Sequence, residues 1–127
     1  MPFEVTVTDA ILFARLHGVF TPQELNHLAA EAEIAEASHP VSLDRLTDLT
    51  AVERFEVGFR EIYYFAIRRS SQRFSRVVKS AIVVQEPVQH GIARMYEALN
   101  ENPQIQIRIL RSIAEAKEWF CPEGGTE

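Results

Sequence analysis

Residues 77–84 read Val-Val-Lys-Ser-Ala-Ile-Val-Val, and this stretch decides the fold class. Its second half, residues 81–84, is apolar without interruption, as is typical of a strand that is covered on both faces. Such strands occur in parallel sheets, where crossover helices cover the two faces of the sheet. The stretch therefore predicts a central strand of an α/β domain.

Four other segments have the pattern of strands. Apolar and polar residues alternate over residues 3–7, and a second strand over residues 11–17 follows a turn at residues 8–10. Two strands joined so tightly are antiparallel. Residues 41–48 have a mixed pattern, and residues 105–109 alternate as an outer strand does.

Three predicted helix starts share the capping-box signature, a hydroxyl residue followed three positions later by glutamate. They are Thr21 with Glu24, Thr50 with Glu53, and Ser112 with Glu115. The predicted helices cover residues 22–37, residues 51–73, a segment from Pro87, and a short segment after Ser112. The resulting order is ββαβαβαβα, a mixed, mostly parallel five-stranded sheet flanked by four helices.

The second predicted helix is rich in aromatic residues. Phe55, Phe59, Ile62 and Ala66 recur at helical spacing, which predicts a core-facing stripe. The run 63–65 can belong to the same core or can line a hydrophobic pocket, and we expect the core. Tyr64 does not lie on the stripe, so it is the residue of this run whose side chain could be exposed to solvent.

Composition fits one small globular domain. The chain has 127 residues, of which 46% are hydrophobic, and a net charge of −5, which argues against a nucleic-acid partner. Its single cysteine, Cys121, forms no disulfide within the chain. With no signal-peptide pattern and no stretch of about 20 apolar residues, we expect a cytoplasmic protein that is at most peripheral to membranes. The domain is expected over residues 1–121, with a frayed tail over residues 122–127.

The element order and several short motifs resemble the SpoIIAA-like, or STAS-like (STAS/SEC14 domain), family of small bacterial proteins. The resemblance spans nearly the whole chain and rests on the order and spacing of five motifs. They are His17-Gly18-Val19-Phe20-Thr21, residues 44–50 (Asp-Arg-Leu-Thr-Asp-Leu-Thr), Lys79-Ser80-Ala81-Ile82-Val83-Val84, Gly91-Ile92-Ala93-Arg94-Met95-Tyr96, and Glu115-Ala116-Lys117-Glu118-Trp119-Phe120.

The resemblance implies a single α/β domain that is a non-enzymatic binding or regulatory module. Related folds act as protein-interaction switches or bind small ligands, including lipids. The best-known switch of this kind is phosphorylated on a serine, whereas this chain has Val57 and Gly58 at the corresponding position. That departure argues against a phosphorylation switch here.

An anion site is predicted beyond the carboxyl ends of the parallel strands, where ligands bind in open α/β sheets. Asp48 and Thr50 are expected near this edge, together with the start of the third helix. There His90 and Arg94 share a helix face, Gly91 permits close approach, and free backbone N–H groups favour an anion. Alternatively, Gly91 eases helix packing while His90 and Arg94 are solvated.

Two charged clusters have a structural and a functional interpretation. Asp44, Arg45 and Asp48 can orient a ligand or can tether the chain internally by ion pairs. Arginines at the end of the second helix complement the helix C-terminus or form a docking patch for an acidic partner. These residues are Arg68, Arg69, Arg73 and Arg76, followed by Lys79.

No catalytic grouping, metal ligand set or cofactor motif is predicted, because the four histidines and single cysteine lack ligand spacing. The leading hypothesis is a module that binds a protein partner or a small hydrophobic or anionic ligand. The alternative is a small enzyme with a site around His90 and Arg94. We also expect a homodimer, because the strand at residues 3–7 offers an unpaired sheet edge.

Overall fold

The computed structural model describes residues 2–121 and confirms the predicted order ββαβαβαβα. The predicted frayed tail at residues 122–127 lies outside the described residues. The elements are β1 (Phe3–Thr8), β2 (Ile11–Phe20), α1 (Pro22–Ala37), β3 (Asp44–Phe55), α2 (Phe59–Ser70), β4 (Val78–Val83), α3 (Pro87–Leu99), β5 (Ile105–Leu110) and α4 (Ile113–Phe120).

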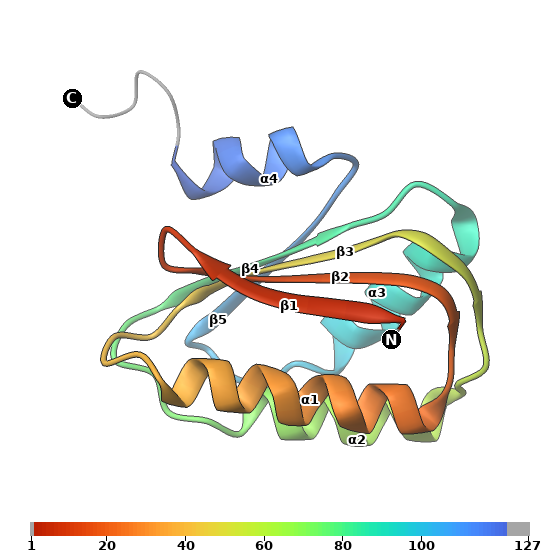
Figure 1. The fold of residues 1–127 in the computed structure, drawn as a ribbon, viewed down its shortest axis with the longest axis horizontal. Helices are drawn as coiled ribbons and strands as arrows, with labels where there is room; N and C mark the ends of the chain where they lie inside the picture. The colour runs from red at the N-terminus through yellow and green to blue at the C-terminus, as the bar shows by residue number, and fades with distance from the viewer. Residues whose placement is uncertain (1, 122–127) are drawn as a thin grey trace.

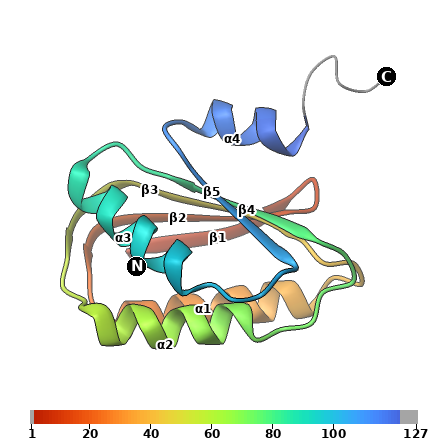
Figure 2. The ribbon, with the colours of Figure 1, turned by 180° about the vertical axis from the view of Figure 1, so that it is seen from behind.

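The five strands form one sheet in the order β1-β2-β3-β4-β5. β1 pairs antiparallel with β2, and the other three pairings are parallel, so the predicted mixed sheet is confirmed. Helices α1, α2 and α3 cover one face of the sheet, and α4 lies on the other (Figures 1 and 2). The sheet therefore has a three-helix side and a thinly covered side.

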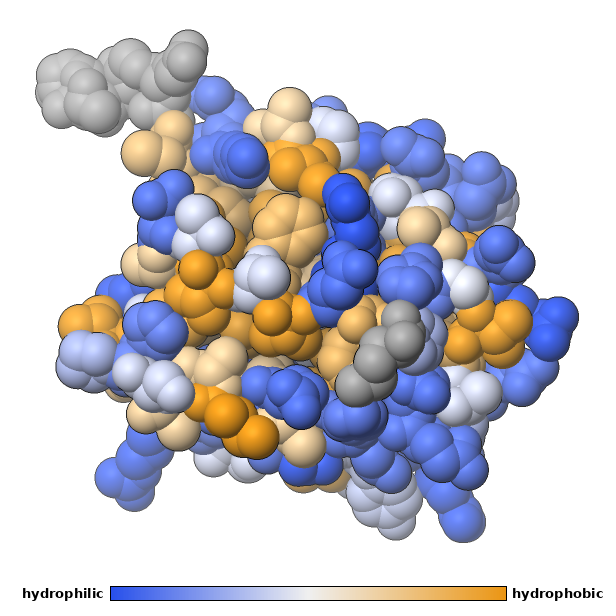
Figure 3. All heavy atoms as spheres, viewed as in Figure 1, coloured by the Kyte–Doolittle hydropathy of each residue, from blue (hydrophilic) through white to orange (hydrophobic). Residues whose placement is uncertain are grey.

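β4 is the buried strand that residues 77–84 predict. Residues 80–84 are all buried, because β3 and β5 flank the strand and helices lie on both faces. The larger core fills the space between the sheet and α1–α3, and a smaller one lies under α4. Because α4 has only eight residues, apolar side chains remain visible over the sheet beside it (Figure 3).

α1 begins as predicted. Thr21 is its N-cap, and the Thr21 hydroxyl accepts a hydrogen bond from the Glu24 backbone N–H at 3.4 Å. Pro22 occupies the first helical position, where its missing N–H costs nothing. The predicted apolar face is buried, and its members are Leu25, Leu28, Ala29 and Ala32.

Replacing Thr21 by alanine is expected to lower the free energy of unfolding by about 1 kcal/mol, because one backbone donor loses its cap. Urea denaturation followed by circular dichroism measures the change. Thr8→Ala is the control, since Thr8 is exposed at the end of β1. A denaturation midpoint for Thr21→Ala equal to that of the control would show that the cap contributes nothing.

The predicted start of the second helix is wrong. Thr50 lies inside β3, which continues to Phe55, and α2 begins only at Phe59. The reason is β2, which runs ten residues, passes through Gly18 at a positive φ of 72°, and pairs with β3 as far as Phe55. The backbone hydrogen-bonding groups of this segment therefore pair with β2, and this pairing overrides the local helix signal.

The aromatic residues around α2 divide between core and surface. Phe55 and Phe65 pack against the main core, and Ile62 and Ala66 are buried as predicted. Phe59 and Tyr63 are exposed, so the core prediction is wrong for these two, whereas Tyr64 is exposed as its place off the stripe indicates. The buried side of α2 therefore carries Ile62, Phe65 and Ala66, and its other aromatic side chains face solvent.

Candidate functional site

A cavity of about 80 Å³ lies in the main core, between the sheet and helices α1–α3. Apolar side chains from both layers line most of it, among them Leu28, Leu49, Ile62, Ile82 and Ala93. The half-buried rings of Phe65 on α2 and Tyr96 on α3 also line it, with their centroids 5.8 Å apart. The space is therefore suited to an apolar group.

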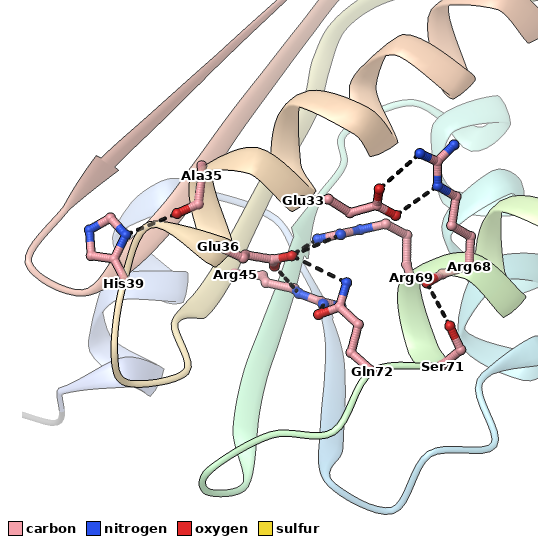
Figure 4. Close-up of polar contacts among 9 residues, drawn as sticks. All are labelled: Glu33, Ala35, Glu36, His39, Arg45, Arg68, Arg69, Ser71 and Gln72. Carbon is pink, nitrogen blue, oxygen red and sulfur yellow. Dashed lines mark hydrogen bonds and ion pairs between the residues drawn. The ribbon is translucent and has the colours of Figure 1, made fainter.

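The cavity also has a polar end, which is formed by Arg45 of β3 and Arg69 of α2. Both side chains are buried, with exposed fractions of 4% and 6%. They converge on Glu36, in the last turn of α1 (Figure 4). Arg69 forms a bidentate pair with Glu36 at 3.0 and 2.9 Å, and Arg45 Nε donates to Glu36 Oε2 at 3.0 Å.

Gln72 completes this network with longer bonds. Its side-chain oxygen accepts from Arg45 Nη2 at 3.5 Å, and its nitrogen donates to Glu36 Oε1 at 3.4 Å (Figure 4). These distances exceed the usual range for hydrogen bonds in proteins, whereas the three bonds between Glu36 and the arginines fall within it. Gln72 is therefore the most weakly held member.

The network contains two guanidinium groups and one carboxylate, a net charge of +1 in a largely dry place. Burial alone raises the pKa of Glu36, but the hydrogen bonds and charges of Arg69 and Arg45 outweigh it, and the pKa lies below its usual value. Burial, together with the nearby charge of Arg69, lowers the pKa of Arg45. The positive charge of the two arginines is only half compensated.

One hydrogen-bond donor of Arg45 has no partner among the described residues. Nη1 of Arg45 is buried and has no hydrogen-bond partner within residues 2–121, while Nε and Nη2 bond to Glu36 and Gln72. The guanidinium plane lies over the Phe74 ring, with Cζ 5.2 Å from the ring centroid. A buried cationic donor without a partner costs more than a neutral one, so this atom indicates an unfilled anion position.

A second, open cavity of about 480 Å³ lies on the outer side of the network. It is a polar groove between the end of α1 and the segment that follows α2, and Glu36, Gln72 and Arg73 are among its lining residues. Because Arg45 and Arg69 line the inner cavity while Glu36 and Gln72 line the groove, the four side chains form the wall between them.

This site lies at the opposite edge of the sheet from the predicted crevice. Arg45 is the second residue of β3. Glu36 and Arg69 lie in the last turns of helices that return to the start of the parallel strands, and Gln72 follows α2. The predicted crevice lies beyond the carboxyl ends of the parallel strands instead.

The structure brings only part of the predicted anion site together: Asp48 and Thr50 are hydrogen-bonded to each other, and the Gln89 side chain on α3 donates to the Thr50 carbonyl at 3.3 Å. Asp48 is buried and points to the same face as Leu46, under α4, where it accepts from Arg15 at 3.3 Å and from the Thr50 hydroxyl at 2.7 Å. His90, Gly91 and Arg94 are exposed on α3, which covers the other face. An anion-binding role for the α3 residues stays a prediction.

The predicted basic patch is not one surface. Arg69 is interior, Arg68 forms a bidentate pair with Glu33 at 2.7 and 2.8 Å, and Arg76 contacts Asp44 at 3.0 Å. Arg73 is exposed and, in the part of the chain that the structure describes, forms no ion pair. Asp44, Arg45 and Asp48 likewise have separate partners rather than forming one cluster.

Within residues 2–121, no group of three or more histidine, cysteine, aspartate or glutamate side chains is placed to hold a metal ion. Over the same residues, no helix is both long and apolar enough to cross a bilayer.

No protein-family model and no curated protein matches the chain. A solved structure does match over nearly its whole length, with a TM-score of 0.64 and 15% sequence identity. It is an uncharacterized protein from the DUF3478 family with a SpoIIAA-like fold from Shewanella loihica PV-4, and the match covers 94% of this chain and 92% of that one. The chain has a SpoIIAA-like fold. At this identity the likeness establishes the architecture, which confirms the predicted STAS-like fold class.

The SpoIIAA-like fold accounts for how the site is assembled, but sequence reasoning missed the residue at its centre, Glu36. A signal was present. Glu36 follows Leu25, Leu28 and Ala32 on the buried stripe of α1, and Arg69 follows Ile62 and Ala66 on that of α2. A charged residue that continues an apolar stripe is expected to reach the interior, where it needs a partner.

Proposed function

We propose that this SpoIIAA-like domain is a non-enzymatic binding module that takes a small amphipathic molecule into the cavity between its sheet and helices. The observation that carries the proposal is an apolar cavity that ends at two buried arginines sharing one carboxylate. Ligand sites are commonly apolar spaces with a few placed polar groups, and this cavity has that composition.

The alternative, an enzyme with a site around His90 and Arg94, has less support. Both side chains lie on the exposed surface of α3, and neither lines the inner cavity or the groove. Their nearest described ionic contact is a 3.9 Å pair between Arg94 and Glu97 on the same helix. This is the geometry of solvated side chains, which the structural interpretation of these residues predicted.

Partners of the module remain predictions. β1 lies at the sheet edge, so its outer side is available for the homodimer that the sequence predicts. A protein partner would most simply respond to ligand through α2 and α3, since both line the cavity and carry exposed side chains.

Filling the cavity tests the proposal. Ala93 on α3 is buried and lines the cavity, so Ala93→Met places a flexible side chain where the ligand would lie. We expect wild-type protein purified from its own host to carry a small molecule in native mass spectrometry, and Ala93→Met to lose it. The extra volume costs about 1–3 kcal/mol at most sites, which leaves a folded protein.

Ala98→Met is the matched control, because Ala98 lies on the exposed side of the same helix. It is expected to retain the bound mass. Xenon provides a second measurement, since apolar cavities bind it: xenon-induced NMR shifts of the Ile82 and Leu49 methyl groups should appear in the control and vanish in Ala93→Met. Equal bound mass and equal shifts in the two variants would contradict the proposal.

A further inference from the structure

The charge at the polar end of the cavity selects the kind of ligand. Arg45, Arg69 and Glu36 together carry a net charge of +1, and all three side chains are at most 13% exposed. A buried charge without a counter-charge is costly, so a ligand with one negative charge is favoured there. A phosphate monoester carries about −1.5 to −2 at neutral pH and would overcompensate. The balance therefore favours a singly charged headgroup such as a carboxylate.

The geometry provides a position for that headgroup. Arg45 uses the Nε side of its guanidinium for Glu36, and its Nη1 is the buried donor that no described residue satisfies. Beside it, Gln72 is held only by bonds of 3.5 and 3.4 Å. A carboxylate has the planar, two-oxygen form that pairs best with guanidinium, and it can replace the neutral amide of Gln72.

The size of the cavity limits the rest of the ligand. An apolar cavity of about 150 Å³ encloses benzene, and the space here is about 80 Å³. A short unbranched chain suits this volume, because most of the lining is apolar.

We infer that the ligand is a monocarboxylic acid with a short apolar chain, whose carboxylate displaces Gln72 and binds Arg45 beside Arg69 while the chain fills the cavity. This inference rests on the proposed function and specifies its ligand class. The groove that Gln72 lines offers the route for the headgroup, since it opens on the outer side of the network.

The test compares butanoate with 1-butanol, which has the same chain length and no charge, by NMR titration of the full chain at pH 7. We expect butanoate to bind at least tenfold more tightly, because a hydrogen bond to a charged group corresponds to about ten- to a hundredfold in affinity. In Arg45→Met, butanoate should lose that advantage and bind as weakly as 1-butanol. Affinity for 1-butanol should change by less than about threefold, since the cavity remains apolar.

Arg45→Met also separates recognition from structure. The variant keeps the Glu36–Arg69 pair, now balanced one to one, so it leaves no uncompensated buried charge, which is what makes disruption of a buried ion pair costly. Its denaturation midpoint should therefore equal or exceed that of the wild type. Arg68→Met is the control, because Arg68 pairs with Glu33 at the surface, and it should bind both probes as the wild type does.

Two results would overturn the inference, and they differ in what else they affect. Equal binding of butanoate and 1-butanol to the wild type would exclude the carboxylate site and leave the proposed binding function standing. If neither probe bound the wild type, both the carboxylate inference and the proposed binding function would be contradicted. Because these comparisons use the wild type, they hold even if Arg45→Met does not fold.

Discussion

Replacing Val83 by aspartate is expected to abolish cooperative folding. Val83 is 1% exposed in β4, in the smaller core with Leu46 and Ala116 under α4. Its partner in register on β3 is Asp48, which is itself buried. A carboxylate at position 83 would be dry, unpaired and close to a second carboxylate, at a cost of several kcal/mol. Domains of this size are stable by only about 5–15 kcal/mol.

Circular dichroism during heating and in urea checks this outcome, together with the yield of folded protein. Val77→Asp is the matched control, because Val77 lies one residue before β4 and is 49% exposed. The control should unfold cooperatively near the wild-type midpoint. A cooperative transition for Val83→Asp would overturn the assignment of β4 as the interior strand.

The features that sequence predicted well are those set by local pattern. The apolar run at residues 81–84 predicts a buried strand because no other environment suits it. Thr21 and Pro22 fix the start of α1 because a cap acts within one turn of helix. Such signals depend on residues a few positions apart, so one sequence is enough to interpret them.

The boundary between β3 and α2 was not predictable in this way. Thr50 and Glu53 have the spacing of a capping box, yet the hydroxyl of Thr50 donates to Asp48 and the segment pairs with β2. Hydrogen bonds to a distant strand decided the outcome, and the helix signal acts only within the segment. Tertiary pairing overrides local propensity at such places.

The candidate site was missed for a related reason. Glu36 meets Arg69 across 33 positions of the chain and Arg45 across 9, so no local motif contains the network. The sequence groups Arg45 and Arg69 with charged neighbours along the chain, but in the structure they pair with Glu36 instead. Glu36 and Arg69 both continue the apolar stripes of their helices, which indicates that their side chains reach the interior. This signal does not specify which residues they pair with.

Glu36 should therefore be the residue on which the interior network depends, and Glu36→Gln is expected to lower the free energy of unfolding by about 3–5 kcal/mol. Removal of its charge leaves Arg45 and Arg69 buried without a counter-ion, which is the costly way to disrupt a buried ion pair. Glu33→Gln is the matched control on the same helix. Its pair with Arg68 is 35–41% exposed, so it should cost less than about 1 kcal/mol.

The pH dependence gives an independent measurement of the same interaction. The pKa of Glu36 lies below its usual 4.5 in the folded protein, because Arg69 and Arg45 outweigh the effect of burial. A carboxylate with a lowered folded pKa contributes stability above its unfolded pKa and loses that contribution as the pH falls through the folded value. The free energy of unfolding of the wild type should thus fall steeply below pH 4.5, and that of Glu36→Gln should fall less steeply. Urea titrations between neutral and acidic pH give both curves. If the two curves ran parallel at a constant separation, the Glu36 charge would not be what stabilises the two arginines.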